Sequence, residues 1–236
     1  SISAVQELAS KNQLTFPVAS FQGGLLNPHG QGHELAWELF NQRLQICQQL
    51  EIGTLVVACD ILETTRESVW QPIMDSLKQL ADQAAQADTR VALEFQAEAK
   101  LGNNLQTTAS LVAEINHPFL GICLDAFHFY VGPSNTEDLA CLTSDNLFHV
   151  QLCDLADCPR ELAKDGNRIL PGEGDIPLNA ILTHLSRINY QRHVSIELMN
   201  PQLWQVPALQ FGQTSWSAFT SLLKQAGITE GDSSSA

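Results

Sequence analysis

Positive charge is scarce in this chain, which carries 12 lysines and arginines against 26 aspartates and glutamates, a formal net charge of −14. A surface this acidic repels phosphate backbones, so we expect no nucleic-acid partner. Long apolar runs are also missing, since no stretch reaches the roughly 20 residues that a helix needs to cross a bilayer. Residues 1–10 have the pattern of a helix end and not of a signal peptide. We therefore expect no membrane partner.

Cysteine pairs at metal-binding or redox spacing are missing too. None of the six cysteines forms a C-x-x-C pair, and several lie in apolar runs where a free cysteine is a common small core residue. This pattern predicts reduced thiols and a cytoplasmic setting. A zinc site built from His149, Cys153 and Cys158 is conceivable. However, no fourth ligand falls at a recognised spacing, which favours ordinary core and loop roles for the three.

The 236 residues, 44% of them apolar, are enough for one globular domain with a sizeable core. Hydrophobic patterns alternate between strand and helix along the chain. Strands are expected at 14–21, 54–59, 90–95, 120–125, 147–152 and 193–198. Helices are expected at 33–50, 69–84, 107–115, from Pro177 with Asp175 as its cap, and around 216–226 with Gly227 as its stop. Apolar strands that alternate with helices predict a parallel sheet covered by helices, the α/β class.

Six strands fall short of the eight in a closed (β/α)8 barrel, a fold of roughly 250 residues. We therefore expect a TIM-type barrel that lacks its first two βα units. The prediction is a single, N-terminally incomplete domain at 1–230, followed by a polar, serine-rich disordered tail at 231–236. An open barrel leaves the edge at 14–21 unpaired, which leaves association into a homo-oligomer open.

Four consecutive predicted strands each end in a side chain with a metal-ligating oxygen: Glu94, Asp125, Gln151 and Glu197. The carboxyl ends of barrel strands meet at the mouth of the barrel, where such enzymes carry out their chemistry. Three converging carboxylates repel one another unless a cation neutralises them. An oxygen-rich site suits Mg²⁺ or Mn²⁺ better than zinc or copper. The sequence therefore predicts one divalent metal ion at this mouth.

On the third of these strands, His149 and Gln151 share one face, because side chains alternate along a strand. Gln151 lies four residues past the strand start, as Glu94 and Glu197 do on theirs. Depth therefore favours Gln151 as the ligand, with His149 one layer below as a hydrogen-bonded core residue.

Five segments resemble the sugar phosphate isomerase/epimerase superfamily, the xylose isomerase-like TIM barrels: ALEFQ at 92–96, GICLDAFHF at 121–129, HVQLCD at 149–154, RILPGEGDI at 168–176 and VSIEL at 194–198. The resemblance covers residues 14–226. In that family Glu, Asp, His and Glu from strands five to eight hold a divalent metal. By position these ligands correspond to Glu94, Asp125, Gln151 and Glu197, and 14–21 becomes strand three. Gln in place of His is similar to the 3-dehydroshikimate dehydratases, but it also occurs in other members and does not settle the reaction.

The resemblance also implies roles around the metal. His128 follows Asp125 by three residues, where relatives place a histidine that contacts substrate oxygen or shuttles a proton. The alternative is a solvated loop histidine. Arg168 is suited to hold a substrate carboxylate or phosphate, or else it pairs only with Glu173 or Asp175.

The glycine-rich loop at 22–34 follows a strand and so lies at the mouth of the barrel. Its His29 and His33 are candidates to line the pocket, although a flexible surface loop is as good an interpretation. Asp60 and Glu63 follow the next strand; they are candidates to bind hydroxyls, but helix capping is favoured.

The function favoured by these features is a metal-dependent isomerase or epimerase that acts on a small sugar, keto-sugar or sugar phosphate through an enediolate. Glu94 and Glu197 would take and return the proton, while His128 and Arg168 would fix substrate oxygens. The first alternative is a lyase of the dehydratase type acting on a keto-acid, which Gln151 and Arg168 favour. The second is a catalytically defective or fragmentary barrel. An endonuclease is excluded by charge.

Overall fold

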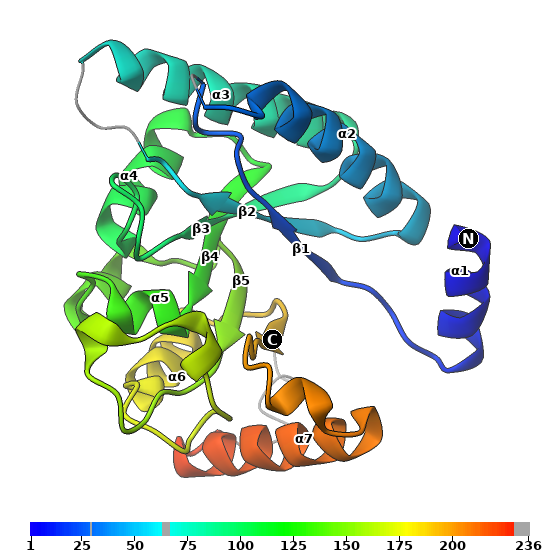
Figure 1. Ribbon diagram of the computed structural model, residues 1–236, viewed down its shortest axis with the longest axis vertical. Coiled ribbons are helices and arrows are strands. Elements are labelled where there is room, and N and C mark those ends of the chain that lie inside the picture. The colour runs from blue at the N-terminus through cyan, green and yellow to red at the C-terminus, as the bar shows by residue number, and fades with distance from the viewer. Residues whose placement is uncertain (29, 63–66, 229–236) are drawn as a thin grey trace.

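The computed structural model describes residues 1–28, 30–62 and 67–228. Six parallel strands form one curved sheet in sequential order, each paired with its neighbours in the chain (Figure 1). The strands are β1 (Val18–Gln22), β2 (Thr54–Cys59), β3 (Arg90–Phe95), β4 (Leu120–Asp125), β5 (Leu147–Leu152) and β6 (Val194–Ile196). This is the six-stranded part of a TIM-type barrel, so the expected fold class is confirmed.

Helix α1 precedes β1 and lies apart at the N-terminus, while the later helices lie around the outside of the sheet, from α2 and α3 on one side to α6 and α7 on the other (Figure 1). Short 3-10 segments η1 (Thr136–Cys141), η2 (Arg160–Leu162), η3 (Asp165–Asn167) and η4 (Leu203–Gln205) lie between them. The α-helices are α1 (Ile2–Lys11), α2 (His33–Leu50), α3 (Glu67–Gln86), α4 (Leu105–Ile115), α5 (Ala126–Val131), α6 (Leu178–Arg187) and α7 (Ala208–Gln225).

Helix starts show where local chemistry sets the boundaries. Asn104 caps α4 by accepting the Thr107 N–H, and Asp125 caps α5 by accepting the His128 N–H. The prediction that Asp175 caps the next helix is wrong, because α6 has Pro177 at its N-cap and no side-chain cap. The backbone N–H of Asp175 instead donates to the Leu155 carbonyl at 2.8 Å, which keeps this residue within the preceding loop.

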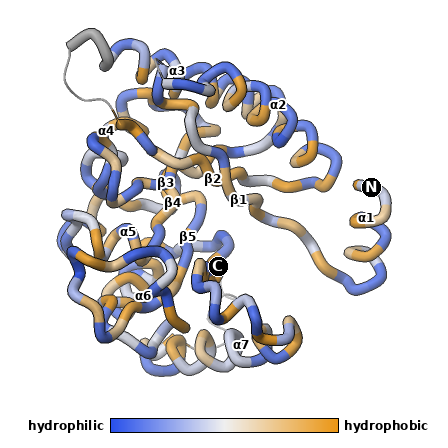
Figure 2. Tube along the Cα trace, in the orientation of Figure 1, coloured by the Kyte–Doolittle hydropathy of each residue, from blue (hydrophilic) through white to orange (hydrophobic). Residues whose placement is uncertain are grey.

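Side-chain alternation divides the core into two apolar layers. On β3, Val91 and Leu93 pack outward under the helices, while Ala92 joins a small inner cluster with Val56, Cys123 and Phe148. Figure 2 shows the corresponding pattern, with hydrophobic stretches along the strands and mixed turns in the helices. Glu94 has the same parity as Ala92, so the strand itself directs this carboxylate to the inner face.

Within the described residues, no helix combines the length and apolar character that spanning a bilayer requires. The six cysteines are free thiols. The tail predicted to be disordered at 231–236 lies outside the described residues, as do His29 and Glu63.

Candidate metal centre

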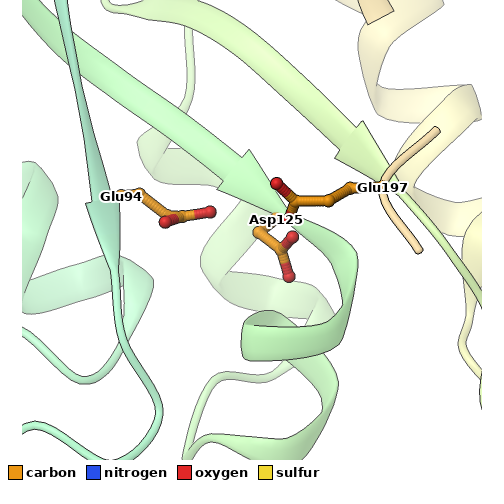
Figure 3. A group of neighbouring side chains, drawn as sticks. All are labelled: Glu94, Asp125 and Glu197. Atoms are coloured by element: carbon orange, nitrogen blue, oxygen red, sulfur yellow. The ribbon is translucent and has the colours of Figure 1, made fainter. Parts of the chain in front are cut away.

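Three carboxylates from separate strands converge at the carboxyl end of the sheet. Glu94 lies near the end of β3, Asp125 at the end of β4, and Glu197 directly after β6. Each contributes an oxygen to a group whose atoms all lie within 4.8 Å of one another. Figure 3 shows the three side chains pointing toward a common space from different elements. Glu94 and Asp125 are buried, and the Glu197 side chain is 23% exposed, so the cluster lies mostly inside the protein and Glu197 is its most exposed member.

Each carboxylate is oriented by a hydrogen-bond donor. Glu94 Oε2 accepts a hydrogen bond from Gln96 Nε2 at 2.5 Å, and Asp125 Oδ1 accepts one from the His128 backbone N–H at 2.8 Å. Glu197 Oε1 accepts one from Gln151 Nε2 at 2.7 Å. The remaining oxygen of Glu94 has no such donor among the described residues. The side chains are therefore fixed in place before any ligand binds.

Gln151 lies on the inner face of β5, level with Asp125 in the neighbouring strand. Its Oε1 accepts a hydrogen bond from the Cys123 thiol at 3.0 Å, while its Nε2 faces Glu197. An amide placed this way brings both a donor and an acceptor to the cluster. Rotation of the amide by about half a turn would direct its oxygen toward Glu197.

His149 lies one layer below, as the spacing predicts. Its Nδ1 is 3.1 Å from the His193 carbonyl, and its Nε2 is 2.9 Å from Ser195 Oγ. Because a carbonyl only accepts, Nδ1 carries the proton and Nε2 accepts from the Ser195 hydroxyl. Burial lowers the pKa of His149 to about 4, so this ring is neutral near pH 7.

Burial and the closeness of the three negative charges shift the pKa values of these carboxyls. Burial, together with the charges of Asp125 and Glu197, raises the pKa of Glu94 well above its ordinary value. Burial and Asp125 raise the pKa of Glu197 to about 8. For Asp125, burial acts in the same direction, but Arg168, His128 and the hydrogen bonds outweigh it and lower the pKa. Two carboxyls with raised pKa values lie beside an ionised one. Such a group suits a divalent cation, whose charge would favour the ionised form of all three.

Arg168 lies inside this cluster and is only 1% exposed. Its Nη1 is 2.7 Å from Asp125 Oδ2 and 3.2 Å from Glu197 Oε2. On the opposite side, Nε and Nη2 donate to Asp165 Oδ1 at 3.0 and 2.7 Å. The guanidinium also stacks on the Phe127 ring, 4.5 Å from its centroid. All three nitrogens of the guanidinium thus donate to an acid, and one face of the group is covered by an aromatic ring.

The alternative partners considered for Arg168 do not pair with it, since Glu173 and Asp175 are absent from its ion pairs. The loop that contains them is instead held by Asp154, whose carboxylate accepts the N–H groups of Gly172 and Ile176 at 2.9 Å each.

His128 is buried on α5 at the side of the cluster. Its Nδ1 accepts the Ala97 N–H at 3.3 Å, which leaves Nε2 to carry the proton of the neutral ring. Burial lowers its pKa. A cavity of about 200 Å³ lies beside it, lined among others by Gln96, Phe127, Arg160 and Asp165.

The glycine-rich loop contributes less than expected in its described part. His33 Nδ1 is 3.3 Å from the Gly24 carbonyl, and its Nε2 accepts from the Trp37 indole at 3.1 Å. Nδ1 therefore ties the loop to α2 and Nε2 is engaged within α2, so neither nitrogen serves the cluster. Asp60 accepts the Gly24 N–H at 2.8 Å, which joins this loop to the end of β2.

The sequence did not predict a role for two residues close to the cluster. Gln96 orients Glu94, and Asp165 holds Arg168. Alternation places Gln96 on the same face as Glu94 two residues on, so a signal for it existed. Asp165 gives no pattern of its own, because its role depends on how the loop before Arg168 folds.

Comparisons with known proteins identify the family and agree with the fold. Over residues 1–226 the chain matches the family described as xylose isomerase-like TIM barrel. It is 28% identical to the inosose isomerase of Bacillus subtilis strain 168 over 192 residues, 80% of this chain and 69% of that protein. It is 26% identical to the 3-dehydroshikimate dehydratase of Pseudomonas putida KT2440 over 163 residues, 68% of this chain and 26% of that protein.

Among solved structures, the crystal structure of the IOLI protein with a bound zinc atom superimposes with a TM-score of 0.85 and 25% identity. The superposition covers 94% of this chain and 82% of that one. The two curated relatives named above extend beyond the stretch that this chain matches, which is 69% of the inosose isomerase and 26% of the dehydratase. Because the family match extends over nearly the whole sequence and the sheet has the corresponding architecture, the chain belongs to the xylose isomerase-like TIM barrel family.

Proposed function

We propose that this protein is a divalent-metal-dependent isomerase or epimerase of a small sugar, keto-sugar or sugar phosphate. The observation that carries the proposal is the convergence of Glu94, Asp125 and Glu197 within 4.8 Å at the carboxyl ends of the strands. The similarity to inosose isomerase supports the same class of reaction.

Glu94, Asp125 and Glu197 would hold Mg²⁺ or Mn²⁺, with the amide oxygen of Gln151 as a fourth ligand. These are hard oxygen donors, which such ions prefer. When bound, the cation would polarise the substrate carbonyl and stabilise negative charge on its oxygen.

Proton transfer would fall to the two glutamates. One carboxylate removes the proton from the hydroxyl-bearing carbon next to the carbonyl; the electrons of that C–H bond form a C=C bond, and the carbonyl π electrons move onto its oxygen, which gives an enediolate. Return of the proton to the other face or to the neighbouring carbon completes epimerisation or isomerisation. Each glutamate would hold the metal through one carboxylate oxygen and use the other oxygen to take or return the proton. His128 Nε2 and Arg168 would orient substrate oxygens.

Solvent exchange tests this proposal. In D₂O with Mn²⁺, an inosose or ketose substrate should acquire deuterium next to its carbonyl, which NMR detects. We expect Glu94→Gln and Glu197→Gln each to reduce exchange by about 100-fold or more while Mn²⁺ binding persists. Glu114→Gln, at an exposed position of α4, serves as the matched control and should exchange normally. Full exchange in either site variant contradicts the assignment.

A lyase is the second candidate, because Gln151 and the similarity to 3-dehydroshikimate dehydratase both favour it. The same enediolate-type anion, with a hydroxyl on the β-carbon, would lose that hydroxyl as water, with the proton that the glutamate had removed. Arg168 would then hold the carboxylate of a cyclic keto-acid. Incubation with 3-dehydroshikimate and Mn²⁺ should produce the ultraviolet band of an aromatic product; no band at high enzyme concentration removes this candidate. Metal binding without turnover of any substrate would instead favour a catalytically defective or fragmentary barrel.

The setting proposed for this activity is cytoplasmic, with a small-molecule partner. The six free thiols support it. Self-association at the β1 edge stays a prediction for measurement in solution.

A further inference from the structure

Every oxygen of Asp125 and Glu197 already accepts a hydrogen bond within the protein. His128 and Gln151 supply one donor each, and Arg168 Nη1 supplies the donor to the other oxygen of both carboxylates, at 2.7 and 3.2 Å. Nη1 therefore bridges two acids that come from β4 and from the segment after β6. A single buried cationic group thus joins two of the three converging carboxylates.

This bridge matters if the proposed function is correct, because the metal ion would need the same two carboxylates. Mg²⁺ binds carboxylate oxygens at about 2.0–2.1 Å. An ion on an oxygen that Nη1 also contacts would lie within about 5 Å of the guanidinium charge. In a site that excludes most water, the two positive charges would repel each other strongly.

The far side of the guanidinium has its own anchor. Asp165 holds Nε and Nη2, and the Phe127 ring supports the face of the group. The backbone of Arg168 is fixed as well, since its carbonyl accepts from Asn200 Nδ2 at 3.1 Å. These contacts hold the backbone, Nε and Nη2, whereas Nη1 alone faces the two acids, so a turn of the guanidinium about the Asp165 contact would not require movement of the strand ends. Asp165 itself is half-exposed, at 54%, so it has room to follow.

We propose that Arg168 is an internal counter-cation of the site, which occupies Asp125 and Glu197 in the metal-free protein and competes with the divalent ion for them. Metal loading turns Nη1 away from Glu197, with Asp165 as the pivot. The turn frees Nη1 for an anionic or hydroxyl oxygen of the substrate. Arg168 thereby couples the metal-loaded state to a site that is ready for substrate, and it keeps the acids paired in the metal-free state.

Calorimetric titration of Mn²⁺ into EDTA-stripped protein tests the competition. Arg168→Gln should bind Mn²⁺ at least about tenfold more tightly than the wild type, because the competing charge is gone. Arg160→Gln is the matched control. Arg160 also lies beside the cavity, but it donates to the Gly132 carbonyl and stacks on Tyr130, without contact to the three acids. Its variant should bind within about threefold of the wild type.

A second measurement uses the wild type alone, in case Arg168→Gln does not fold without metal. Crystal structures of the wild type with and without Mn²⁺ should show Nη1 within hydrogen-bond distance of Glu197 only in the metal-free form. The proposal is overturned if Arg168→Gln binds Mn²⁺ no more tightly than the wild type. It is equally overturned if Nη1 keeps both contacts beside the bound ion.

These outcomes separate the two proposals. Wild type that binds Mn²⁺ with no gain in Arg168→Gln removes the counter-cation role and leaves the proposed function intact. Failure of both proteins to bind Mn²⁺ or Mg²⁺ overturns both proposals. Binding by Arg168→Gln alone supports the competition in its strongest form.

Discussion

Gln151 and His149 lie two residues apart on β5 and face the same side, yet their surroundings differ. Gln151 reaches the carboxylates, whereas His149 is enclosed by the His193 carbonyl and the Ser195 hydroxyl. The alternation of side chains along the strand was sufficient to predict both layers. It could not predict the partners of Arg168, because those depend on a rotamer and on a loop that joins distant parts of the chain.

The enclosed imidazole gives a prediction for stability against pH. The pKa of His149 is about 4 in the folded protein, against an ordinary value near 6.5. As pH falls below 6.5, the unfolded chain takes up a proton that folded His149 does not, so stability is lost from pH 6.5 down to about 4. The loss from this residue should be about 3 kcal/mol. Denaturant unfolding of metal-free protein across this range measures it.

His149→Gln serves as the comparison for that measurement. The variant should be less stable at pH 7, but its free energy of unfolding should fall less steeply as pH decreases. An equal slope in the two proteins would show that other groups cause the acid sensitivity.

At the scale of elements, the loop between β5 and α6 brings Arg168 to the acids, and Asp154 shapes this loop. The carboxylate of Asp154 is buried and accepts three backbone N–H groups, from Leu155, Gly172 and Ile176, each at 2.9 Å. The backbones of Asp154 and Ile169 also hydrogen-bond to each other, which holds the residue next to Arg168 against the segment after β5. One side chain therefore sets the path of the segment on which the guanidinium depends.

Removal of this carboxylate should be costly. We expect Asp154→Ala to lower the free energy of unfolding by about 3 kcal/mol, because three buried N–H groups lose their acceptor. Asp154→Asn should fall between the wild type and Asp154→Ala. Asp75→Ala, on the outer surface of α3, should change stability by less than about 0.5 kcal/mol. Chemical denaturation of the four proteins makes the comparison, and a change below 1 kcal/mol in Asp154→Ala would contradict the role of the loop.

The central elements were more predictable than the edges. The bounds of β2, β3, β4 and β5 agree with the apolar runs in the sequence, because strands buried on both faces leave a continuous signal. β1 and β6 are shorter than predicted, and each pairs with a single strand in the described part of the chain. The predicted cap of α6 failed because the loop tied to Asp154 retains Asp175. α7 begins earlier than predicted, at Ala208, since its exposed first turns show no apolar periodicity.

At the scale of the whole molecule, the sheet collects residues from across the chain into one small volume. Glu94 and Glu197 are separated by more than 100 residues, but the parallel, sequential strand order brings both to the carboxyl end of the sheet. The fold class and this convergence followed from apolar runs that end in oxygen-bearing side chains. The reaction does not follow from the fold, because relatives in the same family isomerise or dehydrate different substrates.

Anomalous X-ray diffraction from crystals of the protein soaked with Mn²⁺ tests the central claim most directly. We expect one ion per chain, about 2.0–2.4 Å from oxygens of Glu94, Asp125, Gln151 and Glu197. The Glu94→Gln variant soaked under the same conditions should show a weaker peak at the same place. An ion bound elsewhere, or no peak between these four side chains at saturating Mn²⁺, would contradict the account.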